Sequence, residues 1–270
     1  MKFEVKNQLA KEPKLWIVKL ISTLVVLALI IWSANSLEYH GIKYTGVSIA
    51  KNILIGLISP SKELLFNFGT NGVLYLLLQT VAIAVLGTII GSIISVPFAF
   101  MCSANIVPKW ISTLGTIIVA AIRTIPAFVY GLMFIRVTGP GAFAGVLTIG
   151  IVSIGMMTKL YIEAIEDLDR NIIESLDVAG CNLAQKVRYG ILPQLSTNFV
   201  STAIYRFEIN LKDATILGLV GAGGIGAPLI FAMNAYRWKE VGAILIGLAV
   251  LVLIVEYCST KIRAKLATGI

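Results

Sequence analysis

Four charged residues and one asparagine stand out in the stretch between residues 195 and 219, where apolar residues dominate. They are Arg206, Glu208, Asn210, Lys212 and Asp213. An ionised group costs roughly 2.5–3.5 kcal/mol at the centre of a membrane-spanning helix, so such groups pair with one another or face water. Glu208 and Lys212 are four residues apart, as are Arg206 and Asn210, so each couple lies on one side of a helix. Two interpretations stay open: structural pairs that hold helices together, or a gate or polar path for an anionic solute.

Arg123 is a further candidate for such a path. It lies in an apolar run from Trp110 to Val137 that Arg123, Thr124 and Pro126 interrupt. Proline removes a helical hydrogen bond, so we expect an interfacial or inner helix followed by a kinked span, with Arg123 and Pro126 at the kink. Arg123 could instead extend its charged end to the lipid headgroups, and both interpretations stay open.

A glycine cluster follows the polar stretch and consists of Gly221, Gly223, Gly224 and Gly226. Its G-x-G-x-x-G spacing also occurs in dinucleotide-binding units, but that motif needs a preceding strand within a parallel α/β unit. Here the motif follows a predicted membrane span, so we interpret it as a flexible turn or a re-entrant segment at the mouth of a pore. A simple tight turn between helices is the alternative.

The sequence offers no constellation for catalysis. His40 is the single histidine and has no partner at metal-ligand spacing, Cys181 has no histidine near it, and the phosphate-binding G-x-x-x-x-G-K-[ST] motif is missing. We therefore expect no catalytic residue, no metal site and no cofactor held by this chain.

Composition identifies the fold class. The chain has 270 residues, of which 57% are hydrophobic and 13% charged, and its mean hydropathy is +0.90. Several apolar runs are long enough to cross a bilayer as helices, so we predict an all-α polytopic membrane protein. The net charge of +8 is typical of basic residues that orient membrane helices, so we expect contact with membrane lipid and none with nucleic acid.

About six spans are predicted, near residues 15–36, 73–100, 110–137, 142–161, 195–219 and 241–257. The basic N-terminal segment and the C-terminal Lys261, Arg263 and Lys265 place both termini in the cytoplasm. We divide the chain into residues 1–72, with the first span and an external amphipathic segment, and a core of residues 73–270.

Residues 159–194 form a polar interlude between two spans. Apolar residues recur there at helical spacing, at Leu168, Ile172, Ile173, Leu176 and Ala179. Gly180 then marks a turn, Asn182 can cap the next helix, and Pro193 can open the following span. The interlude is either an ordinary amphipathic loop or a short helix that inserts into a groove of another subunit.

This interlude resembles the cytoplasmic loop of ABC-importer permeases. That family's pattern is Glu-Ala-Ala, three residues, Gly, nine residues, Ile, one residue, Leu-Pro. Glu174, Gly180, Leu192 and Pro193 match it at the same spacing. Ser175 and Leu176 replace the two alanines, and Gly190 replaces the isoleucine. The segments IRTIPAFVYGL (122–132) and YRFEINLKDATILGLVGAGGIG (205–226) resemble the phosphonate-importer branch.

The resemblance implies a permease of the type I ABC-importer fold, in the cytoplasmic (inner) membrane of a prokaryote, that pairs with a second copy as a homodimer. It implies a separate cytoplasmic ATPase subunit that binds ATP and Mg²⁺, and an extracytoplasmic substrate-binding protein. Residues 159–194 would be the ATPase-coupling loop, with Glu174, Ser175, Gly180, Leu192 and Pro193 as its contact residues. The glycine cluster would lie at the external gate.

The expected function is transport of phosphonate or a related phosphorus oxyanion, without chemistry by this chain. Two alternatives stay open. The first is a permease of the same class for methionine or another small metabolite. The second is an ion-coupled secondary carrier, which would show inverted repeats with paired broken helices.

Overall fold

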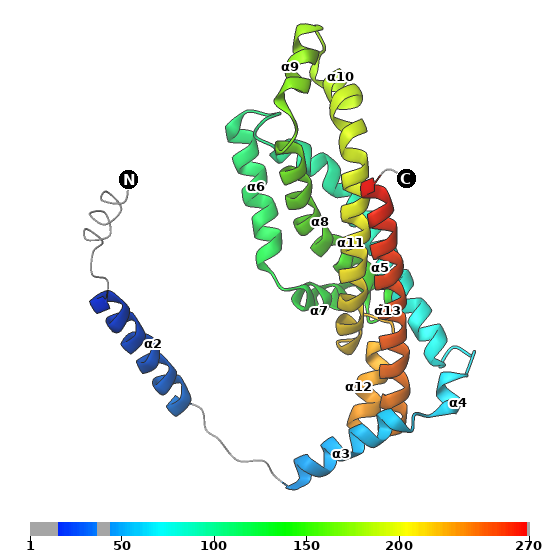
Figure 1. The fold of residues 1–270 in the computed structure, drawn as a ribbon. Coiled ribbons are helices and arrows are strands. Elements are labelled where there is room, and N and C mark those ends of the chain that lie inside the picture. Colours follow the sequence, from blue (N-terminus) through cyan, green and yellow to red (C-terminus); the bar gives the residue numbers. More distant parts are fainter. Residues whose placement is uncertain (1–15, 37–43, 269–270) are drawn as a thin grey trace. The chain divides into compact units, whose positions relative to one another are not determined.

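The computed structural model describes residues 16–36 and 44–268, and the regular structure there is helical throughout (Figure 1). In chain order the helices are α2 (Trp16–Ser36), α3 (Tyr44–Ile58), α4 (Lys62–Leu65), α5 (Val73–Cys102), α6 (Lys109–Thr124), α7 (Ala127–Thr138), α8 (Ala142–Glu166), α9 (Arg170–Val178), α10 (Leu183–Gln185), the π-helical η1 (Lys186–Ile191), α11 (Leu192–Leu219), α12 (Gly226–Asn234) and α13 (Trp238–Thr268). The predicted all-α class is confirmed.

The chain divides into two compact units, residues 1–49 and 50–270. In the first unit, α2 is exposed along its whole length, and large apolar residues lie on all sides of it between Trp16 and Trp32. A helix that is apolar all round needs lipid or another protein surface to cover it. The division proposed from the sequence, after residue 72, stays a prediction.

The second unit is a bundle built around α5 and α8, which make its most extensive helix contact. Gly87 and Gly91 lie one turn apart on α5, where side chains would collide with Ile149 and Ser153 of α8. Small residues at this spacing let two membrane helices approach closely. α11 packs against both helices and carries its polar side chains to them.

Within residues 16–36 and 44–268, four helices are long and apolar enough to cross a membrane: α2, α5, α8 and α13. A fifth span arises if α6 and α7 count as one, and these two meet at an angle of 82°. The predicted kink at Pro126 is therefore a sharp corner. The remaining predicted span lies within α11, which is 28 residues long but too polar to be recognised by composition. An α-helix rises about 1.5 Å per residue, so a helix of this length is nevertheless long enough to cross a bilayer.

Candidate functional site

One face of α11 carries a buried arginine toward α8. Arg206 is only 4% exposed. Its Nη2 lies 3.5 Å from Asp213 Oδ2, its Nε donates to Ser153 Oγ at 3.3 Å, and its Nη1 donates to the Met156 sulfur at 3.0 Å. Arg206 and Asp213 are seven residues apart, two helical turns, so both project from the same side of α11. The arginine is thus paired inside the bundle.

Asn210 joins the same buried cluster. It is completely buried, and its Nδ2 donates at 2.8 Å both to Thr88 Oγ1 of α5 and to Ser153 Oγ of α8. Ser153 therefore accepts from both Arg206 and Asn210 and connects them. Among the described residues, the Asn210 Oδ1 atom has no hydrogen-bond partner. The predicted proximity of Arg206 and Asn210 is thus mediated by a serine on another helix.

A second charged cluster lies between α11 and α13. Glu208 is central: it lies 3.5 Å from Lys212 Nζ and accepts from Arg263 Nη2 and from Ser259 Oγ, both at 3.3 Å. Lys212 also lies 4.0 Å from Glu256. The predicted pair of Glu208 and Lys212 is present. Arg263, which the sequence suggested only as a marker of orientation, is its principal interhelical partner.

The charges on this part of α11 cancel. Arg206 and Lys212 contribute two positive charges, and Glu208 and Asp213 two negative ones, and each cation is within 3.5 Å of a carboxylate. This geometry supports structural pairs that fix α11 to α5, α8 and α13. The role of these residues as a path or gate stays a prediction.

Arg123 and Pro126 lie at the corner between α6 and α7. Pro126 precedes α7 as its N-cap, and the stem of Arg123 packs against Gly155 of α8 while the side chain is exposed. The Tyr130 hydroxyl donates to the Ile122 carbonyl at 3.1 Å and so caps the end of α6. Their part in a path likewise stays a prediction.

The glycine cluster forms a turn that is held by its surroundings. Gly221, Gly223 and Gly224 have φ of +97°, +81° and +76°, which glycine adopts without strain. The Gly224 and Ile225 amides donate to Gln79 Oε1 and Thr80 Oγ1 of α5, and Gly226 packs on the Gly218 backbone. The turn leads into α12 rather than following a strand, so the dinucleotide interpretation stays rejected.

After the end of α8, the polar interlude folds as three short helical segments, α9, α10 and η1, and α9 and α10 project from the bundle (Figure 1). Asp169 precedes α9 as its N-cap, and its side chain accepts from the Asn171 amide at 3.0 Å. It ends before Gly180, which has φ +74° and is followed by a Cys181 amide bonded to the Leu176 carbonyl. Asn182 and Gln185 then cap each other's backbone amides at 2.9 and 2.8 Å. Gly180 therefore lies at a turn and Asn182 caps the next segment, as the sequence predicts.

The outer side of α9 presents the residues that the family pattern singles out. Glu174, Ser175 and Gly180 are exposed, and Val178 is 91% exposed. On the inner side, Leu176 occupies the space where Gly190 of η1 has no side chain. Leu192 and Pro193 form the first residues of α11. A helix with an exposed apolar residue at a projecting end is suited to a partner's groove.

Two of the positions at which this chain departs from the family pattern, Leu176 and Gly190, compensate each other in size. The pattern has a small alanine where this chain has Leu176, and a large isoleucine where it has Gly190. Because these two positions are in contact, a larger residue on α9 is matched by a smaller one on η1. The sequence alone gave no indication of this contact.

Residues 87–260 match the family model of the binding-protein-dependent transport system inner membrane component. The chain belongs to this family and is therefore the membrane-spanning permease subunit of an ABC transporter, a multi-pass membrane protein and a transport subunit rather than an enzyme. Such a subunit functions with an ATPase and a substrate-binding protein.

Curated relatives include phosphorus-compound permeases. The chain is 35% identical over 188 residues to the phosphite transport system permease protein PtxC of Stutzerimonas stutzeri, covering 69% of this chain and 68% of that one. It is 32% identical over 192 residues to the phosphate-import permease protein PhnE of Mycolicibacterium smegmatis, covering 70% and 36% respectively.

Solved structures share the fold. An inward-facing MetNI methionine ABC transporter chain matches with a TM-score of 0.61 and 20% identity, over 70% of this chain and 94% of that one. An amino acid ABC transporter chain with histidines matches with a TM-score of 0.57 and 21% identity, over 82% and 97%. At these identities the match concerns the fold alone.

Proposed function

We propose that this chain is the permease of an ATP-driven importer for phosphonate or a related phosphorus oxyanion. The observation that carries the transport mechanism is the projecting α9, with its exposed Glu174, Ser175, Val178 and Gly180. The cargo class is supported by the relatives named for phosphite and phosphate transport.

ATP and Mg²⁺ bind to the separate ATPase in this proposal. When the ATPase dimer closes, it displaces α9 as a rigid body, and η1 transmits this movement directly to α11, which begins at Leu192. α11 is linked to α8 by hydrogen bonds from Arg206 and Asn210 to Ser153, and to α13 by the Arg263–Glu208 ion pair. A displacement of its first turns therefore changes helix packing through the bundle. The permease thereby alternates between two open sides.

Several finer features belong to the same proposal. Two copies of the chain form a homodimer in the cytoplasmic membrane of a prokaryote, surrounded by lipid. Both termini and α9 lie in the cytoplasm, and the glycine turn lies at the external gate. The substrate-binding protein delivers the cargo from outside and supplies most of the selectivity.

The test is ATP hydrolysis by the chain and its ATPase in lipid nanodiscs. Binding protein loaded with an alkylphosphonate should stimulate hydrolysis more than empty binding protein does. Stimulation only by a methionine-loaded binding protein would replace the cargo and keep the class. Uptake by the chain in proteoliposomes without any ATPase would instead establish an ion-coupled carrier and overturn the mechanism.

A further inference from the structure

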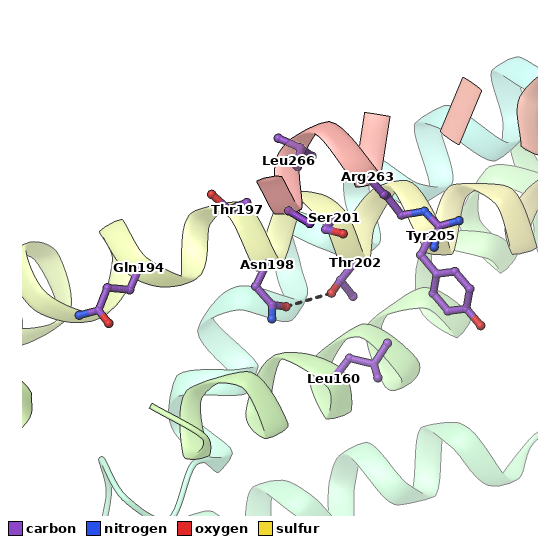
Figure 2. Close-up of a pocket in the computed structure, with 10 residues that line it drawn as sticks. Leu160, Gln194, Thr197, Asn198, Ser201, Thr202, Tyr205, Arg263 and Leu266 are labelled. Atoms are coloured by element: carbon purple, nitrogen blue, oxygen red, sulfur yellow. Dashed lines mark hydrogen bonds between the residues drawn. The ribbon is translucent and has the colours of Figure 1, made fainter. Parts of the chain in front are cut away.

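A pocket of about 630 Å³ lies between α8, α11 and α13, next to the end of η1 (Figure 2). Its floor is one face of α11, whose residues recur every three or four positions and carry hydroxyl or amide groups. They are Gln194, Thr197, Asn198, Ser201, Thr202 and Tyr205. Polar groups of this kind cannot face lipid tails without cost, so the floor is covered by water, ligand or protein.

Arg263 of α13 is the charged residue of this pocket. Its guanidinium lies 5.4 Å from the Tyr205 ring centre, and its Nη2 donates to Glu208 Oε2 at 3.3 Å and to Thr260 Oγ1 at 3.4 Å. Its Nε is buried and has no hydrogen-bond partner among the described residues. A guanidinium has five N–H donors, so Arg263 retains capacity for an additional acceptor.

The lining favours an anion. No carboxylate is among the lining residues. The acidic partner of Arg263, Glu208, also contacts Lys212 and Ser259, and Lys212 lies 4.0 Å from Glu256. The two cations and two carboxylates of this cluster balance, and both carboxylates lie outside the lining of the pocket. Arginine and hydroxyl or amide donors together form the charge-assisted hydrogen bonds that bind phosphorus oxyanions.

Part of the lining is apolar. It consists of Leu160 of α8 and of Leu266 and Ala267 of α13, and Figure 2 shows Leu160 facing the α11 side chains, with Leu266 on the other side of them. An inorganic ion would leave these apolar residues uncovered, whereas an alkyl or glycerol substituent would cover some of them.

We propose that this pocket binds a phosphorus oxyanion that carries an organic substituent, with Arg263 and the α11 hydroxyls holding the oxygens. An alkylphosphonate in transit and the headgroup of an anionic phospholipid share this chemistry. The assignment of the ligand as an alkylphosphonate in transit rests on the proposed function. The binding of a phosphorus oxyanion in this pocket does not.

The experiment uses the full chain in phosphatidylcholine nanodiscs and measures ethylphosphonate binding by isothermal titration calorimetry. Arg263→Gln should weaken binding about tenfold, because one charge-assisted contact of roughly 1.4 kcal/mol or more is lost. The double variant Ser201→Ala/Thr202→Val leaves the Arg263–Glu208 pair in place and should weaken binding about threefold, through loss of neutral hydrogen bonds. Arg136→Gln, an exposed arginine of α7 outside the pocket, is the matched control and should bind like the wild type. Inorganic phosphate should bind more weakly than ethylphosphonate.

A parallel arm identifies the lipid source. In native mass spectrometry after phosphatidylglycerol exposure, retention of this lipid by the wild type and its loss in Arg263→Gln would support a headgroup site. The proposal is overturned if the wild type binds neither probe, or if Arg263→Gln and the hydroxyl variant, with unchanged thermal unfolding midpoints, bind both probes like the wild type. Failure of alkylphosphonate-loaded binding protein to stimulate the ATPase would remove the cargo assignment but not an Arg263-dependent site.

Discussion

At the scale of single residues, the Ser153 hydroxyl connects two buried polar side chains of α11. It accepts from both Arg206 and Asn210, at 3.3 and 2.8 Å, and it is completely buried. Loss of an acceptor leaves a buried charged donor without one of its partners, which costs more than loss of an ordinary hydrogen bond.

Ser153→Ala should therefore lower the free energy of unfolding by about 1–3 kcal/mol, measured as a lower midpoint of thermal unfolding in detergent. Ser95→Ala is the matched control, because Ser95 is equally buried but its hydroxyl donates only to the Gly91 and Ile154 carbonyls. An equal loss in the two variants would contradict a special role for Ser153.

Gly180 has a backbone conformation that few residues tolerate. Its φ is +74°, and a left-handed conformation costs other residues roughly 1–2 kcal/mol, with asparagine among the exceptions. Gly180→Leu should displace the end of α9 and reduce cargo uptake per ATP hydrolysed in proteoliposomes, whereas Gly180→Asn should retain most coupling. Normal uptake per ATP by Gly180→Leu would refute the coupling role of this turn.

At the scale of elements, the α9–η1 contact shows how two short segments keep one orientation. Leu176 fills the space beside Gly190, and Lys186 of η1 pairs with Asp177 of α9. The π-helical form of η1, a feature frequent at functional sites, places this contact just before α11.

A large side chain at position 190 should be tolerated only when the side chain at position 176 is made small. Gly190→Ile places a large side chain against Leu176 and should destabilise the chain by about 1–3 kcal/mol, whereas Leu176→Ala/Gly190→Ile should recover most of this loss. The measurement is a double-mutant cycle of thermal unfolding and of ATPase coupling. Additive effects would show that the two residues do not share one space.

Helix positions along the chain were largely predictable, and the contacts between helices were not. The predicted spans near 73–100 and 142–161 correspond to α5 and α8 because long apolar runs have one stable form in lipid. Large apolar residues surround α5, so hydrophobic periodicity does not indicate which of its faces meets α8. The partners of α11 (Ser153, Thr88 and Arg263) were not predicted, although polar residues within the spans were a usable signal.

At the scale of the whole molecule, α13 ends beside the start of α11, since Leu266 and Gln194 line the same pocket. The end of α13 and the projecting α9 thus belong to the same end of the bundle (Figure 1). If α9 meets an ATPase, the end of α13 faces the cytoplasm as well.

A green fluorescent protein fused after Ile270 should therefore fluoresce in a bacterial host, while an alkaline phosphatase fused there should be inactive, because each reporter matures on one side of the membrane only. A fusion between the exposed Tyr236 and Arg237, in the turn before α13, should show the reverse pattern. Active phosphatase at the C-terminus would invert the proposed topology and remove α9 from contact with a cytoplasmic ATPase.

The 82° corner between α6 and α7 has a consequence for hydration. Peptide groups at such a corner have lost their helical partners, and hydrocarbon offers none in return. The Tyr130 hydroxyl satisfies the Ile122 carbonyl, and the exposed Arg123, Thr124 and Ile125 leave the neighbouring peptide groups accessible. We therefore expect water or a second protein surface, rather than acyl chains, to cover this corner.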